Sequence, residues 1–224
     1  MPGSRLFPLL LAAGTLMAQT PAAITATGNA SISVSPDQAQ VSVGVITSAA
    51  TAQDAAQKNA TQTAAVIDAV KAVLGPSGTI QTIGYSVYPR YGIAQAGQDA
   101  PIVGYYASNT LQVTTNDLSL TGRLIDSANQ AGANSVSGIT FGLQNSDPVR
   151  QQALTLAAKQ ALAHVAAIAA GLRATTGIVL GAQEGSNVSP VVSAGVAAAS
   201  TPTPVETGTV SVSATVTVSV QIVQ

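Results

Sequence analysis

The chain has 224 residues and a formal net charge of −1, and only 8% of its residues are charged although 46% are hydrophobic. Soluble domains typically carry about 25% charged residues. A net charge near zero provides no electrostatic basis for binding nucleic acid or an anionic membrane surface. Because the chain contains no cysteine, disulfides, thiolate catalysis, Cys-ligated metals and a lipid-bearing N-terminal cysteine are excluded.

The N-terminus has the pattern of a signal peptide over residues 1–18. Arg5 supplies a positive start, and Leu6–Ala18 is an apolar run followed by small residues that suit cleavage, with the boundary between 18 and 23. The run is shorter than the roughly 20 residues that span a bilayer; the alternative is a buried N-terminal helix. We expect an exported protein, periplasmic or outer-membrane-associated, with no transmembrane helix in the mature chain and a single domain over residues 24–224.

The first part of that domain predicts two strands and a helix. Residues 24–48 alternate between apolar and polar side chains, with a turn cluster at residues 35–37 that breaks them into two strands. Apolar residues then recur at spacings of three and four over residues 52–74, which is typical of a helix. Thr51 can cap its start, and Gly75 with the following proline can end it.

A second pair of strands and a short helix follow. Thr79–Gly92 and Ile102–Thr115 have strand patterns and are joined by a polar loop. The next helix is expected from Asp117 to about Ala131, with Asn116 as its cap. Residues 134–144 then predict another strand.

A long helix is predicted over residues 147–171. Asp147 is its expected cap, and Pro148 occupies the first helical position, where a missing N–H has no cost. Gly171 closes the run, and His164, the only histidine, lies beside the apolar stripe. The side chains expected to face the core are Leu154, Ala158, Ala161, Val165, Ile168 and Leu172.

The C-terminal part predicts a short strand at Gly177–Gly185, a long loop at 186–208 and a strand at Thr209–Val223. The last strand alternates without any charge, so it needs a central place in a sheet or a partner across a subunit boundary to avoid aggregation. Its apolar face should pack under the helices, while its Ser/Thr face meets water or another subunit. The order of elements predicts an α+β fold, a mostly antiparallel sheet with three helices packed on one face.

No residue pattern indicates catalysis. A metal site at His164 would lack a second histidine or a cysteine as a ligand. The nine acidic residues form no local pair of the kind that glycosidases use. No G-x-S-x-G motif and no phosphate-binding loop occurs. We therefore predict a protein that is not an enzyme, with no catalytic, cofactor-binding or metal-binding residues.

Two segments are candidate contact surfaces. All five tyrosines fall in the predicted hairpin of residues 80–115, where they form either cross-strand pairs or a surface that binds a subunit or a ligand. The loop at 186–208 is either a disordered surface loop or an arm that wraps a neighbouring subunit. The candidate residues are Tyr85, Tyr88, Arg90, Tyr91, Tyr105, Tyr106, Pro190, Val191 and Val192.

The chain resembles the SIMPL-domain family of exported bacterial proteins. The most specific segment is "GANSVSGITF" (Gly132–Phe141), preceded at a fixed distance by "YYASNTLQV" (Tyr105–Val113). The resemblance extends over Ile24–Val45, Ile80–Gly92, Gly104–Leu143 and Val210–Val220. It implies an envelope protein without established catalytic residues, a large channel-like homo-oligomer in one branch, and a link to oxidative-stress tolerance in another.

These observations favour a non-enzymatic, exported homo-oligomer that works in the periplasm or at the outer membrane, with other copies of itself or envelope components as partners. The alternative is a monomeric or dimeric module that binds an envelope peptide or glycan through the hairpin of residues 80–115.

Overall fold

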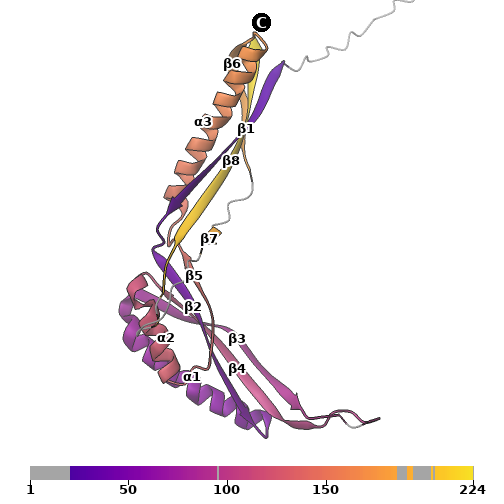
Figure 1. The fold of residues 1–224 in the computed structure, drawn as a ribbon, viewed down its shortest axis with the longest axis vertical. Coiled ribbons are helices and arrows are strands. Elements are labelled where there is room, and N and C mark those ends of the chain that lie inside the picture. The colour runs from indigo at the N-terminus through magenta and orange to yellow at the C-terminus, as the bar shows by residue number, and fades with distance from the viewer. Residues whose placement is uncertain (1–20, 95, 186–190, 194–202, 204, 224) are drawn as a thin grey trace, which may run out of the picture.

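The computed structural model describes residues 21–94, 96–185, 191–193, 203 and 205–223. The α+β class is confirmed, because antiparallel strands and three α-helices follow one another in the predicted order. The expectation of one sheet with all three helices on one face is wrong: the strands form two sheets, each with its own helices (Figure 1). The predicted signal peptide lies outside the described residues.

The first sheet and its helix form the part that we call the α3 lobe. Its strands are in the order β1-β8-β6, with the short β7 also paired to β8. The helix α3 packs on β1 and β8 (Figure 1). The elements are β1 (Ala23–Val34), α3 (Asp147–Gly171), β6 (Thr175–Glu184), β7 (Val191–Ser193) and β8 (Thr209–Val223).

The second sheet and the other two helices form the α1 lobe. Its strands are in the order β3-β4-β2-β5, and α1 lies on β2 and β4 with α2 beside it. The strands are β2 (Gln38–Ala49), β3 (Gly78–Tyr91), β4 (Ile102–Thr115) and β5 (Ser135–Gly142). The helices are α1 (Ala52–Leu74) and α2 (Thr121–Gln130), with 3₁₀ turns at Gly75–Ser77 and Leu118–Leu120.

The two lobes have separate cores, and the chain crosses between them near Asp37. The backbone N–H of Asp37 donates to Gly142 O at 3.1 Å. Its carboxylate accepts a hydrogen bond from Gln144 N at 2.6 Å. Asp37 thus ties the β1–β2 connection to the β5–α3 connection, at the point where the chain passes from one sheet to the other.

The predicted helix caps are confirmed at α1 and wrong in detail at the other two helices. Thr51 Oγ1 accepts from Asp54 N at 3.1 Å, as expected. Before α2, Asp117 caps the 3₁₀ turn Leu118–Leu120, and its carboxylate accepts from Ser119 N at 3.0 Å, while α2 itself follows Leu120 without a side-chain cap. Asn116 instead accepts from a side chain of β2. Asp147 is already inside α3, and its N–H donates to Asn145 Oδ1 at 3.0 Å.

The buried face of α3 differs from the predicted stripe because the helix approaches its sheet very closely. A Cβ placed on Gly28 of β1 would lie 2.1 Å from Ala157 O, so only small side chains fit between helix and strand. Ile168 and Leu172, expected in the core, are exposed, and Leu154 and Ala158 are only partly buried. The residues that face the sheet are Ala153, Ala157, Ala161, Val165 and Ala169.

The central place of β8 in its sheet is confirmed, and its two faces have different partners. Its alternate apolar residues are buried, most of them under α3. On the other face its hydroxyl groups bond across to β1, as Thr27 Oγ1 and Thr217 Oγ1 do at 2.9 Å and Ser33 Oγ and Ser211 Oγ at 2.8 Å. The polar face of the strand therefore forms a ladder of hydroxyl groups within the chain.

Among the described residues, one helix, α3, has the length of a membrane-spanning segment. This helix has 25 residues, and its most apolar window has a mean hydropathy of 1.4, which by length and composition is enough to cross a membrane. In this fold its alanine face packs on β1 and β8.

Candidate functional site

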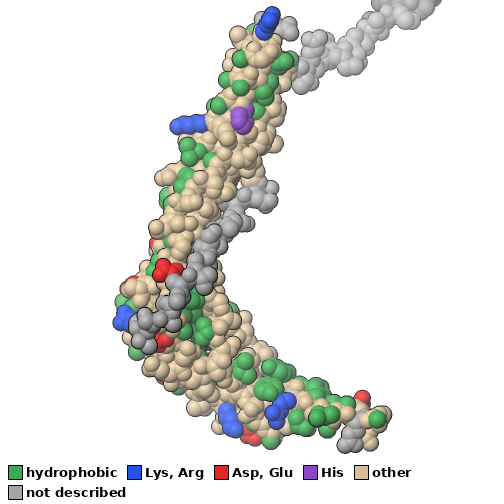
Figure 2. Space-filling model, in the orientation of Figure 1, with side chains coloured by type: hydrophobic (Ala, Val, Ile, Leu, Met, Phe, Trp, Pro, Cys, Tyr) green, Lys and Arg blue, Asp and Glu red, His purple; other side chains and the backbone are tan. Residues whose placement is uncertain are grey.

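The hairpin of β3 and β4 projects as an arm from the α1 lobe (Figure 1). Hydrophobic side chains gather along this arm, as the green atoms in Figure 2 show. Monomeric soluble proteins rarely expose large contiguous apolar patches, and such patches mark contact sites. The exposed large hydrophobic residues of the hairpin and its loop are Ile83, Tyr85, Val87, Tyr88, Tyr91, Ile93, Ile102 and Val103.

One face of the hairpin carries a small aromatic cluster. Tyr88 and Tyr106 lie opposite each other on β3 and β4, and their ring centroids are 5.5 Å apart at an angle of 39°. The guanidinium carbon of Arg90 lies 5.8 Å from the centroid of the Tyr106 ring, within cation–π distance. These three of the predicted site residues are therefore brought together.

The other tyrosines do not all join this cluster. Tyr105 lies opposite Pro89, and Tyr85 opposite Asn109. Asn109 also faces Val45, a core residue under α1, so this face of the sheet is the one that α1 covers. Tyr91, opposite Ile102, is 60% exposed near the end of β3. The tyrosines are thus divided between two faces and do not form one platform.

The described parts of the long loop contact their own chain. Val191 and Val192 belong to β7, which pairs with β8, while Pro190 lies outside the described residues. Thr203 donates from its N–H and its hydroxyl to the carboxylate of Asp126 on α2, at 3.3 and 2.6 Å. A role of the remaining loop residues as an arm to a neighbouring subunit stays a prediction.

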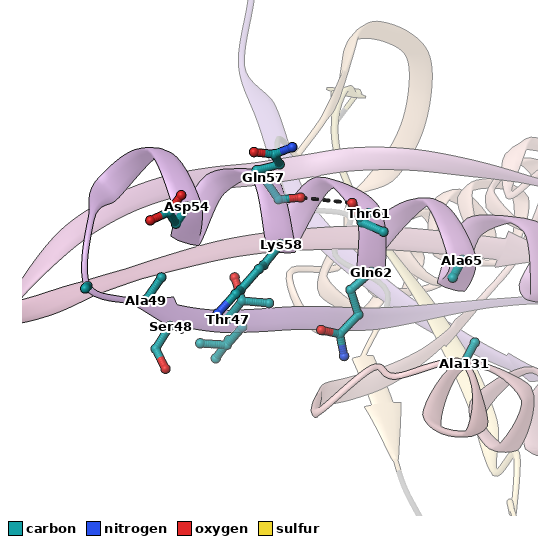
Figure 3. Close-up of a pocket in the computed structure, with 12 residues that line it drawn as sticks. Thr47, Ser48, Ala49, Asp54, Gln57, Lys58, Thr61, Gln62, Ala65 and Ala131 are labelled. Carbon is teal, nitrogen blue, oxygen red and sulfur yellow. Dashed lines mark hydrogen bonds between the residues drawn. The ribbon is translucent and has the colours of Figure 1, made fainter.

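A groove lies between α1 and the end of β2 (Figure 3). It has a volume of about 1160 Å³. The first half of α1, with Asp54 and Lys58, forms one wall, and Ile46–Ala49 of β2 with the adjoining Ala50 form the other. Ala131, which follows α2, also lines it. No residue pattern in the sequence points to this groove, because the groove depends on where the pairing of β5 with β2 ends.

Charged groups are few in this chain. His164 Nδ1 lies 2.9 Å from Thr27 O at the edge of β1, a structural contact. Within the part of the chain that the structure describes, no three His, Asp or Glu side chains gather to hold a metal, and the single ion pair joins Arg150 and Glu184. The hydrogen bond and the charge of Glu184 raise the pKa of Arg150 above its ordinary value.

Comparison with known proteins assigns the chain to a family. Residues 24–220 match the sequence profile of SIMPL, described as "Protein of unknown function (DUF541)". The 26 kDa periplasmic immunogenic protein of Brucella melitensis is 30% identical over 168 residues, which is 74% of this chain and 66% of that protein. Brucella abortus has a protein of the same name with the same identity and coverage.

A more distant relative is "Uncharacterized protein YggE" of Edwardsiella ictaluri, 26% identical over 156 residues, 70% of this chain and 65% of that protein. The alignments thus span just under two thirds of the length of these relatives. The family match covers both lobes, from β1 to near the end of β8, so the chain belongs to the SIMPL family.

Proposed function

We propose that this protein is an exported, non-enzymatic envelope protein that works as a homo-oligomer in the periplasm or at the outer membrane. Export is supported by the apolar run at residues 6–18 and by the Brucella relatives, whose names describe them as periplasmic. A ring around a channel, and a part in oxidative-stress tolerance, are finer proposals that rest on the family resemblance stated above.

The observation that carries this proposal is the apolar surface of the β3–β4 arm. Eight large hydrophobic side chains of the hairpin and its loop are exposed, and Ile93 is 93% exposed. Contact with another copy would remove this apolar area from water, at roughly 25 cal/mol for each Å² buried. Since the arm extends away from the α1 lobe, it can reach a neighbouring copy (Figure 1).

Light scattering on a sizing column tests the assembly, with residues 19–224 as the sample. We expect a mass several times that of the monomer, and we expect the double variant Tyr91→Lys/Ile102→Lys to reduce it, because two charges would enter an apolar contact. Ala64→Lys, which places a charge on an exposed position of α1 outside the groove, is the matched control and should keep the mass. The same mass in wild type and double variant would exclude the arm as the interface.

A second candidate function is the binding of an envelope peptide or glycan by a monomer or dimer. The specific observation in its favour is the cluster of Tyr88, Tyr106 and Arg90, since tyrosine presents an apolar ring with a polar tip and Tyr88 is 44% exposed. A wild-type protein that stays monomeric at micromolar concentrations in the sizing experiment would favour this function over the assembly.

A further inference from the structure

The strand β2 has one edge that β5 covers only in part. Pairing between the two strands ends at Gly44 and Ser135, whereas β2 continues to Ala49. The next residue whose backbone faces this edge is Ile46, and there the side chain of Asn134 takes the hydrogen-bonding role of a neighbouring strand. Its Oδ1 accepts from Ile46 N at 2.8 Å, and its Nδ2 donates to Ile46 O at 2.7 Å.

The following edge position, Ser48, is open. In an antiparallel ladder alternate residues direct their N–H and C=O to the same side, so the backbone of Ser48 points the same way as that of Ile46. Among the described residues, no strand or side chain bonds the backbone of Ser48 on this side. The edge of β1 is protected differently, because Gln160 accepts from Asn29 N at 2.6 Å and His164 contacts Thr27 O.

The groove beside this open edge has the length of a short strand. Its α1 wall runs from Asp54 to Ala65, and twelve residues of helix extend about 18 Å. Its β2 wall is Ile46–Ala49, and four residues of strand extend about 13 Å. A segment laid along β2 would therefore be flanked by helix and strand over its whole length.

The groove is lined by one acidic residue, Asp54, and one basic residue, Lys58. Lys58 follows Asp54 by four residues, the spacing of a helical ion pair, yet within the described residues neither forms one. Asp54 instead accepts from the hydroxyl of Thr51 at 2.8 Å. Figure 3 shows the Lys58 side chain extended from α1 toward β2, beside Thr47 and Ala49. Among the described residues, an ammonium group without an acidic partner thus lines the same groove as Ser48.

We propose that this groove binds an extended peptide segment that carries an acidic side chain, which adds as a strand to the open edge of β2. The backbone of Ser48 supplies a donor and an acceptor for the segment, and Lys58 pairs with its carboxylate. Strand addition to a free sheet edge is an established mode of peptide recognition, in which main-chain hydrogen bonds provide affinity and side-chain contacts provide specificity. The open edge is the side of β2 away from β4, whose Tyr106 pairs with Ser48.

The probe is an acetylated and amidated peptide of alternating valine and threonine with one central aspartate and a fluorescent label. We expect anisotropy to show binding, and hydrogen exchange measured by mass spectrometry to slow in the fragment that contains Ile46–Ala50. The same peptide with lysine in place of aspartate, or with N-methylated backbone amides, should bind at least about tenfold more weakly, since each loses a charge-assisted or main-chain hydrogen bond.

Protein variants identify the two contacts. Lys58→Ala should raise the Kd about tenfold, while Lys71→Ala on the same helix, away from the groove, should leave it within about twofold. Ser48→Pro removes the open N–H and should weaken binding, whereas Ser48→Ala keeps the N–H and should not. If Ser48→Pro unfolds, the N-methylated peptide tests the same hydrogen bonds on the wild-type protein.

Three results would overturn the proposal. The first is equal binding of the aspartate and lysine peptides, and the second is protection from exchange at β1 or β6 in place of β2. The third is protection of Ile46–Ala50 without peptide that disappears on dilution, which would assign the groove to a second copy of the chain. None of these depends on whether the arm of β3 and β4 forms an oligomer.

Discussion

At the scale of single residues, Asn59 joins α1 to two strands of its sheet. Its side chain is 0% exposed, and its Nδ2 donates to Val45 O at 2.8 Å and to Ala107 O at 3.0 Å. These carbonyl groups belong to the neighbouring strands β2 and β4. Thr63 Oγ1 approaches Asn59 Oδ1 at 3.4 Å, so the amide is held on both sides. A buried polar group with such partners fixes how the helix sits on the strands.

We predict that Asn59→Ala lowers the free energy of unfolding by about 1–3 kcal/mol, because two hydrogen bonds are lost inside the core and a small cavity forms. Urea unfolding followed by circular dichroism measures the change. Thr61→Ala, on the exposed side of the same helix, should stay within about 0.5 kcal/mol of the wild type. Equal stability of Asn59→Ala and wild type would mean that the two hydrogen bonds contribute nothing net.

At the scale of elements, the packing of α3 on β1 depends on the absence of a side chain at Gly28. A Cβ there would lie 2.1 Å from Ala157 O and 2.5 Å from Ala161 N, and both are backbone atoms that cannot rotate away. The alanine face of α3 and Gly28 together allow the close approach. The larger side chains of the helix consequently point outward, among them Leu156 and Leu162.

Gly28→Ala should therefore lower the free energy of unfolding by about 1–3 kcal/mol, since the helix has to move away from the strand. Gly181→Ala in β6 is the control, because a Cβ there meets nothing within 4 Å. Thermal unfolding of the two variants compares them directly. A Gly28→Ala protein as stable as Gly181→Ala would contradict the close packing of α3 on β1.

At the scale of the whole molecule, two cores share one chain. One lies under α1 and α2 and the other under α3, and no residue belongs to both. The contacts of Asp37 with Gly142 and Gln144 lie where the chain passes between the lobes. The prediction of a single domain over residues 24–224 is open to a direct test, because separate cores can unfold separately.

Hydrogen exchange of the Gly28→Ala protein provides this test. We expect faster exchange in α3, β1 and β8, with the rates in α1, β2 and β4 unchanged, since the substitution weakens one core only. Mass spectrometry of proteolytic fragments resolves these elements. A uniform increase in the exchange rate over both lobes would show instead that residues 24–224 unfold as one cooperative unit.

Much of the local structure could be predicted from the sequence because it depends on neighbouring residues. The change from a period of two to a period of 3.6 located the strands and helices, and Thr51 capped α1 as its hydroxyl and position indicated. The family segment around Asn134 was also recognisable. The roles of Asn134 and Asn59 were not, because their partners lie 88 and up to 48 residues away in sequence.

By itself, then, the sequence determined the α+β class, the order and approximate bounds of the elements, and the family, since these follow from local periodicity, capping and motif. Only the tertiary structure decided that β8 pairs with β1 and β6, that alanines of α3 face the sheet, and that β2 has an open edge beside Lys58. These features depend on strand register and on how closely distant elements approach, and neither is encoded in the spacing of neighbouring residues.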